Sequence, residues 1–88
     1  MYKDIITFWK AYLESTFTPS EARVVTEPWE GHRGYLLSVF TTMKDGLAVE
    51  VRFNTNKTLS IVDENEKLLK TLDHFESIDS WMKEYTTL

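Results

Sequence analysis

Cysteine is absent from this chain of 88 residues, which also has only 3 glycines and 2 prolines. A disulfide scaffold is therefore excluded, and the composition suits neither a collagen-like repeat nor a low-complexity tail. Residues 1–15 mix charged and aromatic side chains, so we expect neither a signal peptide nor a membrane span there. These absences predict one small cytoplasmic domain that is held together by its hydrophobic core.

Motifs that carry chemistry are also scarce. His32 and His74 are 42 positions apart and no thiolate is available, so we expect no metal site and no cofactor. Asp73 beside His74 is a weak candidate for an oriented base, because adjacent side chains usually point in different directions. An 88-residue domain also has little volume for an enclosed pocket. We therefore predict that the protein is not an enzyme.

The negative charge is concentrated in the last third of the chain. Formal net charge is -4, and residues 63–88 carry seven acidic against three basic residues. Residues 1–62 are balanced, so no basic surface is available to attract duplex nucleic acid through its phosphates. We expect Glu64, Glu66 and Glu76 to steer a basic partner toward this end of the chain. The alternative is a merely solvated acidic surface.

Apolar spacing predicts a helix at the N-terminus. Within residues 2–14 the apolar side chains recur with helical periodicity. Residues 18–21 have the form of a capping box with Pro19 at the first helical position, which is enough for a single turn. Residues 23–27 are typical of a short strand, which Pro28 ends or marks as an edge.

A hairpin is the clearest feature of the middle of the chain. Residues 35–43 and 47–54 flank Asp45-Gly46, a dipeptide typical of two-residue hairpin turns. In that register Phe40 faces Val51 on the core side. The opposite face then carries Glu50 and Arg52 together with four apolar side chains: Tyr35, Leu37, Val39 and Met43. So apolar a face requires cover from the chain's own helix, a second copy or a partner.

Residues 58–62 predict another strand, but residues 63–86 allow two interpretations. One is a turn, a fifth strand at 67–72 and a helix capped by Ser77, and the other is a single long helix beginning at Asp63. We favour the first, because residues 72–77 combine poor helix formers with a good cap.

The predicted fold is thus a single α+β domain over residues 1–88. It has an N-terminal helix, an antiparallel meander of four or five strands and a C-terminal helix. Its expected core consists of Ile5, Phe8, Trp9, Tyr12, Phe40, Val49, Val51, Phe53, Leu59, Ile61, Ile78 and Met82.

The segment 28–34 is the most distinctive candidate for binding. It places Trp29, His32 and Arg33 between glycines, and tryptophan and arginine are enriched among interface hot spots. The alternative is a strand connection whose tryptophan covers the edge of a small core.

A surplus of aromatics, this segment and the acidic third together predict a non-catalytic module that binds another protein, as an accessory or inhibitor protein. Small size and acidity are typical of such proteins in phages and mobile elements, but this likeness is compositional and identifies no family. A homodimer through the apolar face or a sheet edge is also expected. The competing class is a single-strand nucleic-acid binder that uses an aromatic sheet face. The expected partner-binding residues are Trp29, His32, Arg33, Tyr35, Leu37, Arg52, Glu64, Glu66 and Glu76.

Overall fold

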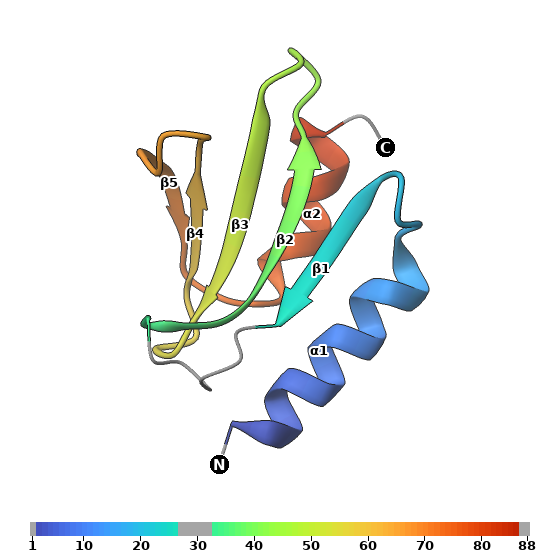
Figure 1. Cartoon of the computed structure of the whole chain (residues 1–88), viewed down its shortest axis with the longest axis vertical. Helices are drawn as coiled ribbons and strands as arrows, with labels where there is room; N and C mark the ends of the chain where they lie inside the picture. Colours follow the sequence, from blue (N-terminus) through green and yellow to red (C-terminus); the bar gives the residue numbers. More distant parts are fainter. Residues whose placement is uncertain (1, 27–32, 87–88) are drawn as a thin grey trace.

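The structure is a computed structural model that describes residues 2–26 and 33–86. Its elements are α1 (Lys3–Thr16), β1 (Ala22–Thr26), β2 (Tyr35–Thr42), β3 (Ala48–Asn54), β4 (Leu59–Val62), β5 (Leu68–Leu72) and α2 (Ser77–Tyr85) (Figure 1). The α+β prediction is confirmed, and the alternative of one long helix after residue 62 is wrong. None of the helices in the described ranges has the length and apolar character needed to cross a membrane.

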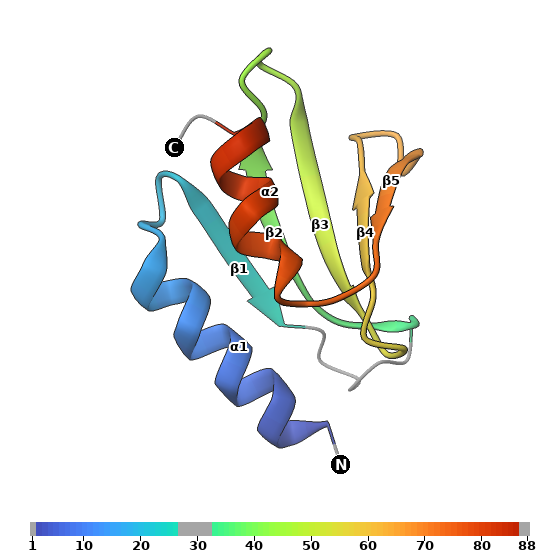
Figure 2. The same ribbon diagram turned by 180° about the vertical axis from the view of Figure 1, so that it is seen from behind.

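The five strands form one antiparallel meander in sequence order, and both helices lie on the same face of it. Figures 1 and 2 show the sheet from its two sides, with α2 across the middle strands and α1 along the β1 side. The ring of Trp9 on α1 contacts Phe53 on β3 and Phe75 before α2, at centroid distances of 5.5 and 5.8 Å. Tyr12 on α1 also donates a hydrogen bond to Asp79 on α2. The fold therefore has two layers, and no described helix covers the other face of the sheet.

The core lies between the sheet and the helices. Its strand residues point toward the helices and are at most 3% exposed: Leu37, Val39, Val49, Val51, Phe53, Leu59 and Ile61. Burying each of these side chains contributes about 1.5–3 kcal/mol. Two predicted core residues are wrong, because Phe8 is 61% exposed and Phe40 is 37% exposed.

The error at Phe40 comes from the β2–β3 turn. The Met43 amide donates to the Leu47 carbonyl, so the loop contains three residues and not two, with Gly46 at φ 90°. One extra loop residue shifts the register by one position, and Val39 therefore lies opposite Val51. Because side chains alternate along a strand, this shift exchanges the two faces of β2.

The predicted grouping of Leu37, Val39 and Met43 on one face with Glu50 and Arg52 is wrong for the same reason. Leu37 and Val39 are completely buried beneath the helices, and Met43 packs against the core. Tyr35 and Arg52 stay on the opposite side, which we call the outer face.

The three hairpins that join β2 to β3, β3 to β4 and β4 to β5 share one design. In each, the third loop residue has a left-handed backbone: Gly46 at φ 90°, Lys57 at φ 72° and Glu66 at φ 61°. The amide of that residue donates to the carbonyl of the residue that precedes the loop, at 2.9 to 3.0 Å. A left-handed backbone costs a residue with a Cβ about 1–2 kcal/mol. Only the first of the three turns has the glycine that makes it easy to recognise in sequence.

Candidate functional site: the outer face of the sheet

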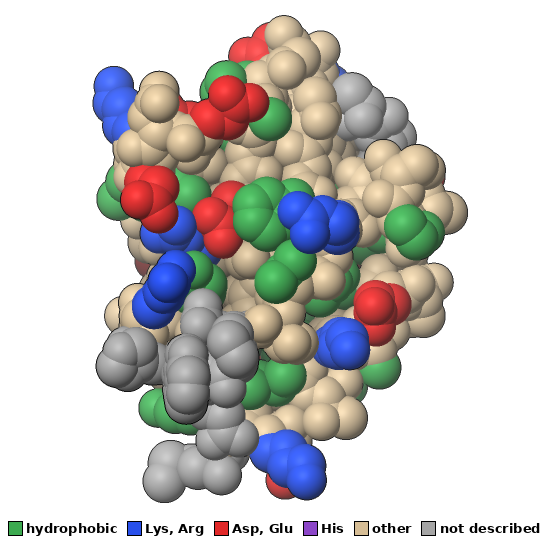
Figure 3. All heavy atoms as spheres, viewed as in Figure 1, with side chains coloured by type: hydrophobic (Ala, Val, Ile, Leu, Met, Phe, Trp, Pro, Cys, Tyr) green, Lys and Arg blue, Asp and Glu red, His purple; other side chains and the backbone are tan. Residues whose placement is uncertain are grey.

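One row of residues crosses the outer face from edge to edge. Each of its members pairs with the next one on the neighbouring strand: Arg23, Phe40, Glu50, Val62 and Leu68. Of the six large hydrophobic residues that are exposed in the described part of the chain, this face carries three: Val25, Phe40 and Leu68. Figure 3 shows hydrophobic side chains between charges of both signs over these strands. The face is therefore chemically mixed, with exposed apolar side chains among charges of both signs.

Two arginines lie on aromatic rings across this face. The guanidinium carbon of Arg23 is 4.7 Å from the ring centroid of Phe40, and that of Arg52 is 4.8 Å from the centroid of Tyr35. Contacts of this kind contribute about 0.5–1 kcal/mol at exposed sites. They cover one side of each ring and hold both guanidinium groups close to the sheet.

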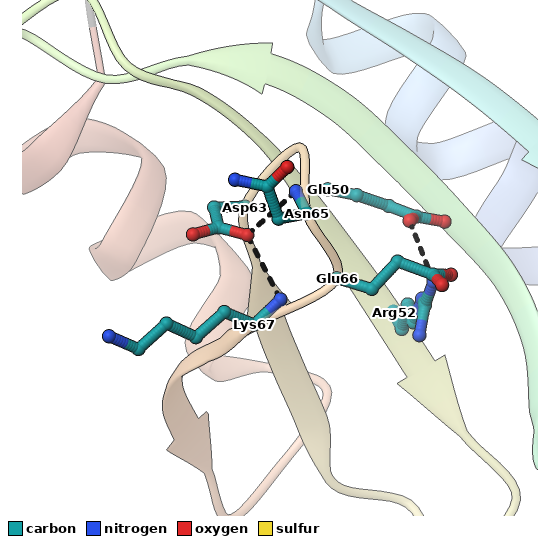
Figure 4. A network of polar contacts seen from close by, with 6 residues as sticks. All are labelled: Glu50, Arg52, Asp63, Asn65, Glu66 and Lys67. Carbon is teal, nitrogen blue, oxygen red and sulfur yellow. Dashed lines mark hydrogen bonds and ion pairs between the residues drawn. The ribbon is translucent and has the colours of Figure 1, made fainter.

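Arg52 is also the centre of an ion network (Figure 4). Its Nη2 lies 3.2 Å from Oε1 of Glu50 and 2.9 Å from Oε1 of Glu66. Partial burial lowers the pKa of the Arg52 guanidinium, but the hydrogen bonds to Glu66 and Glu50 together raise this pKa by more than burial lowers it, so its net shift is upward. Arg52 therefore remains charged, and its charge is shared between two carboxylates of the same face.

A hollow of about 530 Å³ opens on the outer face between Phe40 and the β4–β5 turn. We call it the acidic hollow. Four of its lining residues carry carboxylates, and no described lining residue is basic. The hollow is lined by Phe40, Ala48, Val49, Glu50, Asp63, Glu64, Asn65 and Glu66. Carboxylates beside an aromatic wall suit a basic side chain, through ion pairing and contact with the ring.

The β4–β5 turn holds this rim of carboxylates in place. One oxygen of Asp63, Oδ1, accepts hydrogen bonds from the amides of Asn65 and Lys67, both at 2.9 Å. In Figure 4 the side chain of Lys67 points away from Glu50 and Arg52. Glu64 is exposed, and its side chain forms no hydrogen bond or ion pair within residues 2–26 and 33–86. Its carboxylate is therefore available to a cation from outside.

Metal binding is not supported in this part of the molecule. Within the two described ranges, no three histidine, aspartate or glutamate side chains are grouped so that they could hold a metal ion. Asp73 and His74 are both exposed.

The structure brings together four of the residues that the sequence suggested for binding. Tyr35 and Arg52 are in contact on the outer face, Glu66 pairs with Arg52, and Glu64 lines the acidic hollow.

Others are separated from that group. Leu37 is buried in the core, so its predicted place on a binding face is wrong. Glu76 is exposed just before α2, and β5 separates it from the β4–β5 turn. Arg33 is exposed immediately before β2. Trp29 and His32 lie outside the described residues, so the binding role of segment 28–34 stays a prediction.

Sequence reasoning placed Glu50 on the face of Tyr35 and Arg52, but it missed Arg23 and Phe40 as members of the same site. The correct β2–β3 register would have placed Phe40 opposite Glu50, on the face that carries Arg52. Arg23 follows from the pairing of β1 with β2, for which the sequence has no turn signal.

Comparisons with protein-family models, curated proteins and solved structures give no match for this chain. Function is therefore inferred below from the chemistry of the outer face.

Proposed function

We propose that this protein is a non-catalytic module that binds another protein through the outer face of its sheet. The observation that supports this proposal is the acidic hollow beside Phe40, on a face that no described helix covers. Aromatic anchors beside a pocket are the usual centres of protein interfaces. An accessory or inhibitor role would follow if the module occupies a functional surface of its partner.

The partner that this surface fits is basic at the point of contact. A lysine or arginine side chain in the hollow would lie close to Glu50 and Glu64 and against the ring of Phe40. The net charge of -4 favours encounter with such a partner and makes the association rate sensitive to salt.

Single-strand nucleic-acid binding has less support. Stacking of bases needs open ring faces inside a positive groove. On the outer face Tyr35 is covered on one side by Arg52, whose charge is already shared by Glu50 and Glu66. The hollow next to them is acidic, which repels phosphates.

Affinity capture from the native host with matched variants tests the proposal. Phe40→Ala and Glu64→Gln remove the aromatic wall and one free carboxylate, whereas Phe8→Ala and Glu84→Gln make the same changes at exposed positions on the helices. We expect wild type and both helix variants to recover the same partner, and both outer-face variants to recover at least about tenfold less.

Equal recovery by all four variants would contradict the proposal. A fluorescence titration with single-stranded oligonucleotides at low salt is the second measurement. Binding that Tyr35→Ala abolishes and Phe8→Ala leaves intact would favour the nucleic-acid function instead.

A further inference from the structure

We propose that a second copy of this chain is one partner of the outer face, with Arg23 of each copy seated in the acidic hollow of the other. The inference rests on the proposed function, because it uses the same binding surface. It differs by naming a partner that carries the complementary charge on its own outer face.

The charges of the outer face are arranged so that the face complements itself. Arg23 lies at the β1 end of the cross-strand row, and the hollow with Glu64 lies toward the β4–β5 end. Within the described residues Arg23 forms no ion pair with a carboxylate. Its guanidinium makes a cation–π contact with the ring of Phe40. Glu64 likewise has no cationic partner there. Within residues 2–26 and 33–86, an unpaired cation and an unpaired carboxylate therefore lie apart on a single surface.

Two-fold symmetry would bring these charges together. When two sheets pack face to face about an axis parallel to their strands, β1 of one copy lies over β5 of the other. Arg23 at the β1 end of each row then approaches Glu64 in the partner's β4–β5 turn, beside Leu68 at the other end of that row, twice in each dimer. Glu50 in the middle of the row lies near this axis, and its charge is already paired with Arg52.

The apolar residues of the face follow the same arrangement. Val25 and Phe40 lie on the β1 side and are 36% and 37% exposed, whereas Leu68 on β5 is 55% exposed. The same rotation places Leu68 of one copy near Val25 and Phe40 of the other. Apolar contacts and ion pairs would thus be made together, as closed isologous interfaces require.

The sheet edge is a weaker place for self-association. β5 contains Lys70, and its pairing with β4 is interrupted by a register shift between Ile61 and Val62. A lysine and a bulge are two of the devices by which proteins prevent edge strands from pairing with another chain.

Charge exchange between the two positions tests this inference. Arg23→Glu and Glu64→Arg each place like charges together twice in the dimer, and each should weaken dimerisation at least about tenfold. An equimolar mixture of the two variants should form a heterodimer, because one of its ion pairs is the natural one and the other is restored with its signs reversed. The double variant Arg23→Glu/Glu64→Arg should dimerise with itself, because both of its ion pairs are restored with their signs reversed.

Sedimentation equilibrium from low micromolar to millimolar concentration gives the readout, with circular dichroism to show that each variant is folded. Lys10→Glu and Glu84→Arg make the same charge changes at exposed positions on α1 and α2, and they should dimerise like wild type. A wild type that stays monomeric throughout overturns the inference, and so does a mixture that fails to associate. Neither result affects capture of a different protein by Phe40 and Glu64, so failure of the dimer and failure of the proposed function are distinguishable.

Discussion

The two faces of this sheet consist of the same strands, yet they have opposite chemistry. Toward the helices, β3 presents Val49, Val51 and Phe53, which are at most 3% exposed. Toward the outer face, the alternate residues of the same strand include Glu50 and Arg52, which form an ion pair. The inner face therefore supplies the hydrophobic core of the domain, and the outer face is the surface that we propose for recognition.

The contrast is sharpest for two phenylalanines on neighbouring strands. Phe53→Ala on the inner face removes a ring with no exposed surface that contacts Trp9 and Phe75, so we expect a loss of about 3–5 kcal/mol in unfolding free energy. Phe40→Ala on the outer face should cost only about 1 kcal/mol, because that ring is 37% exposed. Urea denaturation of both variants measures the difference. Similar losses would show that the outer face also contributes core packing.

The ion network makes the next largest contribution. Arg52→Ala leaves Glu50, whose side chain is 14% exposed, without its counter-charge and uncovers the ring of Tyr35. We expect a loss of about 1–2 kcal/mol, because the pair is partly solvated and leaving a largely buried charge unpaired is unfavourable. In the double variant Arg52→Ala/Glu50→Gln the loss should be smaller than the sum of the single losses. Arg33→Ala, at an exposed position, is the control and should change stability by less than about 0.5 kcal/mol.

The hairpin backbones offer a test in which stability should increase. Lys57 has a φ of 72° and Gly46 a φ of 90° in equivalent positions of two turns. Lys57→Gly should stabilise the domain by about 0.5–1 kcal/mol, since glycine adopts this backbone without strain although it adds entropy to the unfolded chain. Gly46→Ala should destabilise it by about 1 kcal/mol. If both substitutions shift the thermal midpoint in the same direction, the shared turn design is wrong.

The smallest effect concerns the contact between the helices. The hydrogen bond to Asp79, with burial adding to it, raises the pKa of Tyr12 above its usual value, so the folded state favours the neutral phenol. The contribution of this hydrogen bond to folding stability is fully present below the unfolded pKa of tyrosine, about 10, and is lost as pH rises through the higher folded pKa. The stability difference between wild type and Tyr12→Phe should therefore shrink at alkaline pH, and urea titrations on both sides of about pH 10 measure it. A difference that stays constant across this range would show that the hydrogen bond does not control the titration.

Much of the fold was predictable from local signals. Helical spacing predicts α1, and the structure confirms the single turn at residues 18–21, where the Glu21 carboxylate accepts a hydrogen bond from the Thr18 amide at 3.0 Å. Residues 72–77 correctly separate β5 from α2, but the predicted cap is wrong, because Ser77 is the first residue of α2 and Glu76 at the N-cap makes no side-chain cap hydrogen bond. In each case the deciding interactions are made within a few residues of the chain.

The register of β2 against β3 could not be predicted in this way. Asp45-Gly46 fits a two-residue loop and also the last two positions of the three-residue loop that forms. What decides between them is burial of Leu37 and Val39 beneath both helices, which is a contact between distant parts of the chain. The same one-residue ambiguity moved Phe40 to the wrong face, and so the central residue of the candidate site was missed.

Site-specific photo-crosslinking in the native host tests most directly the claim that one face stabilises and the other recognises. A benzoylphenylalanine in place of Phe40 reports on the outer face, and one in place of Phe8, which is 61% exposed on α1, reports on the helix side. We expect discrete crosslinked species from position 40, to a second copy or to another protein, and none from position 8. Crosslinks from position 8 alone, or from neither position, would contradict it.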